Sequence, residues 1–303
     1  MSKIGTAISL IKNNRDEFML QIVRRFNFIL SDKCYIKLFY RYKMGRKLDL
    51  KNPLRFTEKL QWLKLYDRNP LHVIMVDKEK VKPYVTQILG EEYVIPTLGV
   101  WDSFDDIDFD KLPNKFVLKT TNGGGSIGVV ICHDKSKLDL FKAKQNIEKG
   151  LKLNLYRKLR EWPYKGVKPR IIAEQMLEDK SGDLHDYKFY CFNGEPKFLL
   201  VSSNRFTNHN FTYFDLDFNK MDISSVMGAQ SSMVPEKPNN FEEMKDVVKK
   251  LCKDMSHVRV DLYSCNNHVY FGEMTFYDSS GYDNFSSDEW DVKIGSFLTL
   301  PHK

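Results

Sequence analysis

An arginine, two carboxylates and a threonine stand at alternating positions in a predicted hairpin near the end of the chain. They belong to the segments Arg259-Val-Asp261 and Glu273-Met-Thr275. Successive side chains of a strand point to opposite faces, so the two members of each segment share a face. Carboxylates that face each other across a hairpin repel unless a cation separates them, and Mg²⁺ prefers oxygen ligands. The pattern indicates a magnesium site for phosphate chemistry; a surface ion pair with Arg259 is the alternative.

A second chemical signal is the glycine-rich segment Lys119-Thr-Thr-Asn-Gly-Gly-Gly-Ser-Ile-Gly128. Its successive backbone amides could surround phosphate oxygens, and a lysine at the end of the preceding strand would add a positive charge. The segment is not a Walker A loop, because Gly-Lys-Ser/Thr and a long helix do not follow. A glycine-rich hairpin tip without a function remains the alternative.

A third signal is the apolar run Ile171-Ile-Ala-Glu-Gln-Met-Leu177, which ends in polar residues. A strand of this kind can connect two lobes. Its backbone groups would then contact an adenine edge while Met176 and Leu177 pack against the ring.

The elements that must position these residues follow from the spacing of apolar side chains. The pattern predicts helices over 8–45, 57–66, 77–89, 135–160 and 241–255. It predicts strands over 93–96, 115–119, 128–132, 171–177, 187–193, 196–202, 258–263 and 268–275. Helices come first and antiparallel hairpins later, without the βαβ rhythm of a doubly wound sheet. The expected fold class is therefore α+β with mixed and antiparallel sheets.

The chemical segments stand in the same order as in the ATP-grasp superfamily, which the chain resembles from about Asp77 to Gly281. A closer resemblance, to the TupA-like branch, covers nearly the whole chain after about residue 30. It is carried by the segments Phe56–Asp67, Pro96–Trp101, Arg160–Tyr164, Asp186–Phe189 and Phe192–Pro196. That branch is named for teichuronopeptide biosynthesis and occurs among bacterial surface-polysaccharide genes. The resemblance implies an ATP-grasp fold that binds ATP between two lobes, preceded by helices.

The resemblance also implies which residues bind the nucleotide. In that superfamily lysines contact phosphate, glycines and a serine form a lid, a hinge lies beside adenine, and a carboxylate holds the ribose. The matching residues here are Lys78, Lys119, Gly123, Gly124, Gly125, Ser126, Glu174, Gln175, Leu177, Asp186 and Lys188. Of the hinge residues, Gln175 and Leu177 would offer main-chain contacts to adenine.

The implied catalytic residues are Arg259, which would neutralise charge at the reacting carboxyl, and Lys119. The implied Mg²⁺ ligands are Asp261, Glu273 and Thr275. Two features depart from the superfamily. Thr275 stands where many relatives have asparagine, which would weaken a second magnesium site, and Asp278-Ser-Ser-Gly281 replaces the usual Pro-Gly.

The expected activity is that of a carboxylate–amine ligase that converts ATP to ADP and phosphate in surface-polysaccharide biosynthesis. Its partners would be ATP, Mg²⁺, an acidic sugar or amino acid, and membrane-associated polysaccharide machinery. Arg205, His209 and Phe211–Phe214 are acceptor candidates, although a structural loop is the preferred interpretation of these residues. The alternatives are an ATP-grasp sugar kinase, a non-catalytic scaffold, and a glycosyltransferase that uses Asp106-Ile-Asp108 or Asp215-Leu-Asp217.

Net charge and cysteine content indicate which ligands and which cellular compartment suit the protein. The 303 residues carry a net charge of +7, which suits an anionic ligand but is too small and too evenly spread for a nucleic-acid binder. The five cysteines are odd in number and form no CxxC pair, which predicts a reducing compartment. With no recognisable signal peptide or long apolar run, the sequence predicts a cytoplasmic protein. Basic and aromatic residues interleave in Tyr35–Met44, which fits a helix on a membrane surface or, alternatively, an ordinary amphipathic helix.

The expected division of the chain has four parts. Residues 1–70 form a helical N-terminal region, and 71–112 form the first part of the ATP-grasp unit. Residues 113–175 form the lid and central lobe, and 176–303 form the C-terminal lobe with the metal site.

Overall fold

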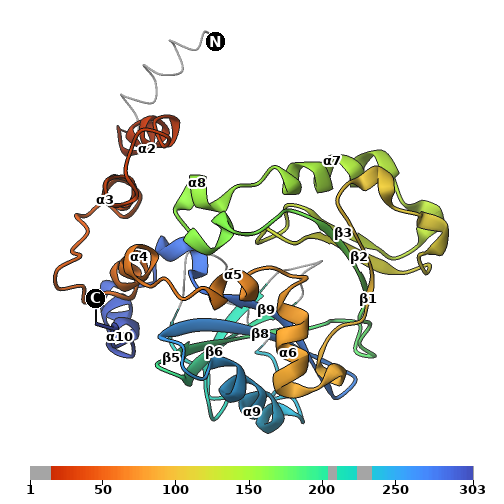
Figure 1. Ribbon diagram of the computed structural model, residues 1–303. Helices are drawn as coiled ribbons and strands as arrows, with labels where there is room; N and C mark the ends of the chain where they lie inside the picture. Colours follow the sequence, from red (N-terminus) through yellow and green to blue (C-terminus); the bar gives the residue numbers. More distant parts are fainter. Residues whose placement is uncertain (1–14, 204–209, 224–233, 303) are drawn as a thin grey trace.

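The computed structural model describes residues 15–203, 210–223 and 234–302 (Figure 1). Its helices are α2 (Arg15–Arg25), α3 (Asp32–Met44), α4 (Phe56–Tyr66), α5 (Leu71–Met75), α6 (Val81–Leu89), α7 (Leu140–Leu151), α8 (Leu155–Leu159), α9 (Phe241–Cys252) and α10 (Asp288–Ser296). Its strands are β1 (Thr97–Trp101), β2 (Phe116–Thr120), β3 (Val129–Cys132), β4 (Ile171–Gln175), β5 (Asp186–Phe192), β6 (Glu195–Ser203), β7 (Asn210–Asp215), β8 (His257–Cys265) and β9 (His268–Thr275).

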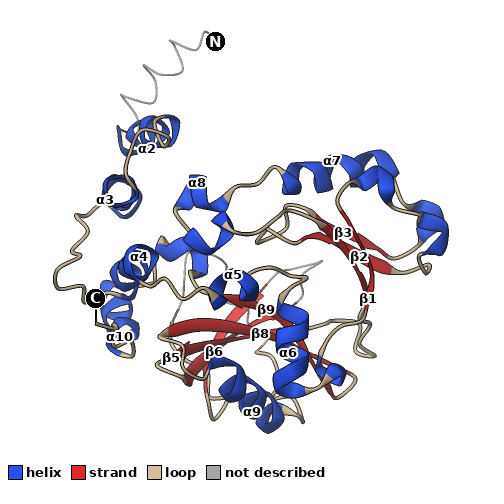
Figure 2. Cartoon of the chain, in the orientation of Figure 1, coloured by secondary structure: helices blue, strands red, loops and turns tan. Residues whose placement is uncertain are grey.

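The strands form two sheets, and every pair of neighbouring strands is antiparallel. The smaller sheet has the order β1-β4-β2-β3, and the larger one has the order β7-β6-β5-β8-β9. Helices α2 to α4 precede both sheets along the chain and project to one side in Figure 2. The predicted α+β class and the predicted hairpins are confirmed.

The larger sheet has a core face that packs on α9 and an opposite face that carries both the polar side chains of the site and buried aromatic side chains such as Phe192. On the core face Phe189 stacks on Phe241 of α9, with ring centroids 5.9 Å apart. Because side chains alternate along β5, the neighbours Lys188 and Tyr190 point to the opposite face. Helix α9 therefore covers one side of this sheet and leaves the other for the site.

The smaller sheet has its own hydrophobic core with α7, formed by side chains such as Phe116, Leu118 and Ile147. Helix α7 approaches β3 closely at two glycines. A Cβ on Gly150 would lie only 2.5 Å from the Cα of Gly128, so neither position has room for a side chain. This contact fixes the end of the glycine-rich segment against α7.

The predicted single helix over 8–45 is wrong for its described part, because α2 ends at Arg25 and α3 begins at Asp32. Ser31 caps α3 by accepting a hydrogen bond from the Cys34 amide (3.3 Å). The aromatic residues of α3 favour the ordinary amphipathic helix over the membrane-surface helix, the two interpretations of Tyr35–Met44. Tyr35 and Tyr40 are completely buried. Aromatic side chains from α3 thus belong to the core.

Three further boundaries differ from the predictions. The Asp77 side chain accepts hydrogen bonds from the Glu79 and Lys80 amides, so a turn occupies the expected start of a helix that begins at Val81. The strand predicted over 93–96 begins only after Pro96, at Thr97. The helix predicted over 135–160 is divided into α7 and α8, because Asn154 caps a new helix.

A buried histidine makes the stability of this fold pH-dependent. His257 packs against Phe56 and Phe192, and its Nδ1 lies 2.9 Å from the Cys191 carbonyl oxygen. Burial lowers the pKa of His257 to about 4, although the hydrogen bond to Cys191 opposes this effect. The ordinary pKa of about 6.5 applies to the unfolded chain, which therefore binds a proton that the folded protein excludes.

We expect neutral His257 to make its full contribution to the free energy of unfolding above about pH 6.5. As the pH falls towards 4, the free energy of unfolding should decrease by up to about 3 kcal/mol because of this group. Urea unfolding of the wild type and of His257→Phe at about pH 7 and about pH 4.5 measures it. The variant should lose less stability on acidification. Equal losses in both proteins would contradict this role of His257.

Candidate active site

The larger sheet brings the predicted metal and phosphate residues into one row. Lys188 on β5 pairs with Asp261 on β8, and Asp261 pairs with Glu273 on β9. Arg259 and Thr275 form a pair in the next row on the same face. The alternation that predicted these shared faces therefore places five polar side chains together from three strands.

Two cations hold the Asp261 carboxylate. Arg259 contacts it through two nitrogens, Nε to Oδ1 at 2.7 Å and Nη2 to Oδ2 at 2.8 Å. The Lys188 ammonium lies 2.6 Å from Asp261 Oδ2 and 2.5 Å from Asp186 Oδ2. Asp261 is only 1% exposed; burial raises its pKa, and the charges of Arg259 and Lys188 oppose this shift. Lys188 thus connects the predicted ribose residue Asp186 with the predicted metal ligand.

Glu273 is half-buried and lies among more distant cations. Its carboxylate is 3.5 Å from Lys78 Nζ and 3.4 Å from Arg259 Nη2. Burial alone would raise the pKa of Glu273, but the charges of Lys78, Arg259, Lys188 and Lys119 outweigh it and lower the pKa to about 2. Glu273 is therefore an ionised carboxylate at any physiological pH. Thr275 Oγ1 lies 3.5 Å from Glu273 Oε1.

Lys78 connects this row to the glycine-rich loop of the other sheet. Its ammonium donates to the Gly123 carbonyl, and its backbone amide donates to the Thr121 carbonyl (3.2 Å). The same ammonium pairs with Glu273. Lys78 thereby joins the two sheets at the place where the sequence predicts phosphate.

The tip of the glycine-rich loop is exposed at Gly124, Gly125 and Ser126, while Gly123 is buried. Gly125 has a φ of +72°, a conformation that favours glycine. A Cβ on Gly124 or Gly125 would meet no atom within 4 Å. The loop has the room and the backbone freedom that a lid over a triphosphate needs.

Glu174 of β4 holds two lysines, Lys119 just before the glycine-rich loop and Lys82 of α6. Its oxygens lie 2.6 Å from Lys119 Nζ and 2.6 Å from Lys82 Nζ. Burial alone would raise the pKa of Glu174, but the charges of Lys119 and Lys82 lower it. The sequence interpretation missed Lys82, whose only signal is its position four residues after Lys78.

The predicted hinge continues β4 beyond this glutamate. The Gln175 amide donates to the Pro96 carbonyl (3.0 Å), so a contact of Gln175 with adenine would have to use its own carbonyl. Leu177 lies two residues beyond the end of β4 and is half-buried.

Asp278 is the main residue that the sequence interpretation missed. Its Oδ1 accepts from Arg259 Nη1, and its Oδ2 accepts from the Tyr190 hydroxyl (2.6 Å). It opens the 3-10 turn Asp278–Gly281, in which Ser279 and Ser280 have φ values of +46° and +56°. The segment that replaces the superfamily's Pro-Gly therefore supplies a second carboxylate to Arg259.

Helix α4 holds this strained turn in place. The buried ammonium of Lys64 donates to the Ser280 carbonyl and hydroxyl, both at 2.7 Å, and Gln61 Nε2 donates to the Gly281 carbonyl (2.9 Å). Burial lowers the pKa of Lys64 to about 7, and the charge of Glu161 opposes this shift. The Phe56–Asp67 and Arg160–Tyr164 segments that carry the family resemblance thus meet at the turn that positions Asp278.

The Asp-x-Asp segments considered for a glycosyltransferase serve local turns. Asp108 accepts from the Asp110 amide (3.2 Å), and Asp215 accepts from the amides of Asp217 and Asn219. The structure gives these aspartates ordinary roles at helix ends and turns.

The acceptor candidates fall into three groups. Arg205 and His209 lie outside the described residues. Phe214 stacks on Phe218 (4.2 Å between centroids) in the core, so it does not line the site. Leu200 of β6 pairs with Lys188 of β5 on one side and with Tyr213 of β7 on the other. Tyr213 therefore lies on the same face of the sheet as Lys188.

The side chains at this site fit a magnesium ion. No group of three or more Asp, Glu, His or Cys residues suited to a metal occurs in the described part of the chain. Mg²⁺ bound with a nucleotide needs only one or two carboxylates, since phosphate oxygens and water complete its coordination. Asp261 and Glu273 are register partners on adjacent strands and supply those two carboxylates.

Comparisons with known proteins give similar solved structures. D-alanine–D-alanine ligase from Bacillus anthracis is 18% identical over 67% of this chain and 57% of that one, with a TM-score of 0.40. The Helicobacter pylori D-alanine–D-alanine ligase is 17% identical over 80% of this chain and 69% of that one (TM-score 0.42). The L-amino acid ligase from Bacillus licheniformis is 13% identical over 90% and 57% (TM-score 0.45). The chain thus spans 57% of the length of the first of these structures.

No curated protein matches the chain significantly. The family described as TupA-like ATPgrasp matches residues 58–299. This match runs from α4 to the residues just after α10 and includes both sheets and every residue of the polar row. The chain belongs to the TupA-like ATP-grasp family.

Proposed function

We propose that this protein is an ATP-dependent ligase that activates a carboxylate as an acylphosphate and couples it to an amine. The observation that carries the proposal is the pairing of Asp261 and Glu273 within a group of cations that reaches the glycine-rich loop through Lys78. ATP-grasp families consist typically of such ligases. The charge pattern suits a bound triphosphate, whose negative charges need both a divalent ion and fixed cations.

We infer that ATP lies between the two sheets. The ammonium groups of Lys78, Lys119 and Lys188 would contact phosphate, and Gly123–Ser126 would close over it. Residues 174–177 would lie along adenine, and Asp186 would accept hydrogen bonds from the ribose. We keep the division of the chain into a helical region at 1–70, ATP-grasp segments at 71–112 and 113–175, and a C-terminal lobe at 176–303 as part of this proposal. One hydrophobic core, between Phe104 and Ala173, is separate from the core that the N-terminal helices share with the C-terminal lobe.

Asp261, Glu273 and the Thr275 hydroxyl would hold Mg²⁺. The ion would supply charge neutralisation at the phosphate oxygens. In the structure Lys78 and Arg259 contact Glu273 at 3.4–3.5 Å, longer than a tight ion pair. This spacing leaves Glu273 oxygens available to a metal, whereas Asp261 is already held firmly by Arg259 and Lys188.

The reaction would proceed in two steps. A carboxylate oxygen of the substrate attacks the γ-phosphorus, the bond to the β–γ bridging oxygen breaks, and ADP leaves. The amine nitrogen then attacks the acyl carbon, phosphate leaves, and the amine loses a proton. Arg259 would stabilise the negative charge near the reacting carboxyl, and Lys119 would stabilise that on the γ-phosphate. Closure of the loop would keep water from the acylphosphate.

We further infer a role in the synthesis or modification of a bacterial surface polysaccharide, at the inner face of the membrane. No described helix is both long and apolar enough to cross a bilayer. The connection between α2 and α3 exposes Phe28 (76%) and Ile29 (68%) next to Arg24 and Arg25. Exposed apolar side chains beside cations suit peripheral contact with an anionic membrane.

Release of ADP tests the proposed reaction. The purified protein is incubated with Mg–ATP and a panel of uronic acids, amino sugars and amino acids, separately and in pairs. ADP release that requires both an acid and an amine supports the ligase. Release with a hydroxyl acceptor alone would identify a kinase, and cleavage of a nucleotide-sugar without ATP would identify a glycosyltransferase.

Lys119→Met tests the nucleotide site itself. A lost charge-assisted contact to phosphate should weaken ATP binding about tenfold to a hundredfold. Titration calorimetry with a non-hydrolysable ATP analogue measures the change. Lys115→Met is the matched control, because Lys115 precedes the same strand and pairs with exposed Glu178 (2.5 Å). Equal affinities of the Lys119 variant and the wild type would remove Lys119 from the site.

A further inference from the structure

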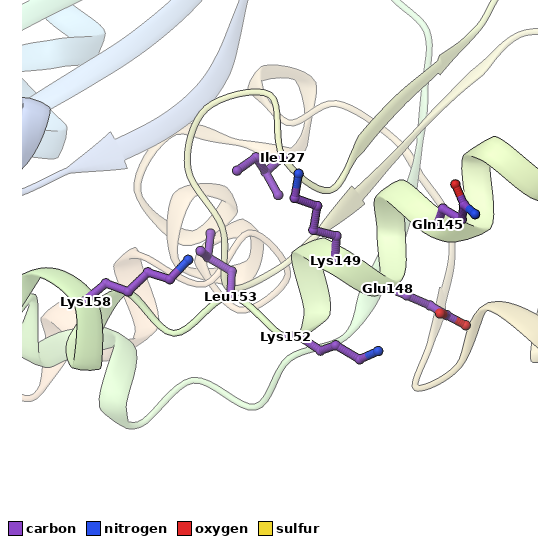
Figure 3. Close-up of a pocket in the computed structure, with 7 residues that line it drawn as sticks. All are labelled: Ile127, Gln145, Glu148, Lys149, Lys152, Leu153 and Lys158. Atoms are coloured by element: carbon purple, nitrogen blue, oxygen red, sulfur yellow. The ribbon is translucent and has the colours of Figure 1, made fainter. Parts of the chain in front are cut away.

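A pocket of about 450 Å³ lies beside the glycine-rich loop, at the junction of α7 and α8 (Figure 3). Its volume falls within the range of small-molecule sites, about 300–1,000 Å³. Ile127 of the loop and Leu153 of the junction give it an apolar part. No residue assigned to ATP or magnesium lines it.

The pocket has an excess of positive charge. Lys149, Lys152 and Lys158 line it, and none of them has an ion-pair partner within 4.0 Å among the described residues. The single acid of the lining, Glu148, lies 4.0 Å from Lys144. Figure 3 shows Lys149 pointing towards Ile127 and Lys158 pointing towards Leu153.

Other lysines of the same region, unlike these three, form ion pairs with aspartates. Lys142 pairs with Asp139 at 3.1 Å, and Lys144 pairs with Asp105 at 2.6 Å. Cations next to an apolar wall, without acids of their own, are suited to an anion that carries an apolar surface.

Helix α7 and its junction with α8 hold both ends of the glycine-rich loop. Asn122 at the start of the loop donates to the Leu153 carbonyl (2.9 Å). Gly128 at its end donates from its amide to the Asn146 side chain (3.2 Å). A ligand in the pocket would therefore contact the α7–α8 segment that hydrogen-bonds the glycine-rich loop, close to the proposed site of phosphate transfer.

We propose that this pocket binds an anionic saccharide unit of the acceptor, with Lys149 and Lys158 on its acid group. The apolar face of a sugar ring fits Ile127 and Leu153, and the Gln145 amide is available for a ring hydroxyl. The pocket is open to solvent, so a longer chain can continue beyond the bound unit. Calling this saccharide an acceptor rests on the proposed ligase function. Binding of the saccharide to the pocket does not require ATP.

Calorimetric titration of the full chain with trigalacturonate, without ATP or magnesium, tests the proposal. The variant is Lys149→Gln with Lys158→Gln, and binding should weaken about tenfold. The matched control is Lys137→Gln with Lys142→Gln, which removes the same charge from lysines 83% and 82% exposed that pair with their own aspartates. The control should bind trigalacturonate as the wild type does.

Neutral maltotriose and inorganic phosphate complete the experiment. Maltotriose should bind at least about tenfold more weakly than trigalacturonate if the acid group is recognised. The proposal is overturned if trigalacturonate does not bind, if the control loses as much affinity as the variant, or if maltotriose binds equally well. Displacement of trigalacturonate by an equal concentration of phosphate would show a simple anion site and overturn the saccharide assignment.

This outcome is separate from that of the ligase proposal. Absence of acid- and amine-dependent ADP release would reject the ligase while leaving the binding result unchanged. Conversely, a protein that releases ADP with small substrates but does not distinguish the lysine variant from its control would keep the ligase and lose the pocket.

Discussion

Replacement of Glu273 by glutamine is expected to reduce ATP turnover by about a thousandfold or more while leaving the fold intact. Glu273 keeps its negative charge because the surrounding cations lower its pKa to about 2. An amide has nearly the same shape but no charge to hold a divalent ion beside Asp261. Its removal also leaves Lys78 without its carboxylate partner on β9.

The measurement is ADP release by Glu273→Gln under the conditions that support wild-type turnover. Glu195→Gln is a matched control, because Glu195 is an exposed residue of β6 that pairs with Lys249 (3.3 Å) away from the site. Near-ultraviolet circular dichroism of both variants reports on folding. Unchanged turnover in a folded Glu273 variant would show that the metal assignment is wrong.

Replacement of Asp278 by asparagine is expected to lower kcat by about a hundredfold with little change in ATP affinity. Arg259 is held by Asp261 on one side and by Asp278 on the other. Asparagine can still accept a hydrogen bond from Tyr190, so the turn should keep its shape. The neutral side chain holds the Arg259 guanidinium less firmly, which should matter most when charge develops at the reacting carboxyl.

The steady-state rates of Asp278→Asn separate this effect from a general loss of structure. A positioning role predicts a lower kcat at an almost constant KM for ATP. Asp288→Asn is the control, since Asp288 pairs with Arg55 (2.6 Å) at the start of α10 and has no ion pair with Arg259 or Lys188. An unchanged kcat, or a loss matched by a large fall in the thermal unfolding temperature, would reject the positioning role.

The hairpin of β8 and β9 was predictable because its signal is local. Alternation of apolar and polar residues from His257 to Thr275 fixes both strands, and it also fixes which side chains share a face. The same reasoning located the hairpin of β5 and β6 across Asn193-Gly194. Chemistry that depends on one hairpin could therefore be inferred from residue types and spacing.

Contacts between distant segments carried no such signal. Arg160 donates hydrogen bonds to the carbonyls of Asn27 and Leu30, and so holds the break between α2 and α3. These residues lie more than a hundred positions from Arg160, so the apolar spacing of 8–45 favoured one continuous helix. Asp278 was missed for the same reason, because its partner Arg259 and its support from Lys64 meet only in the folded chain.

The fate of the carboxylate oxygen is the most direct test of the central proposal. An acid that supports turnover is labelled with ¹⁸O in its carboxylate, and the phosphate released with ADP is analysed by mass spectrometry. Formation of an acylphosphate transfers one labelled oxygen to that phosphate when the amine displaces it. We expect labelled phosphate in amounts equal to ADP. Phosphate without label would contradict activation of the carboxylate by ATP.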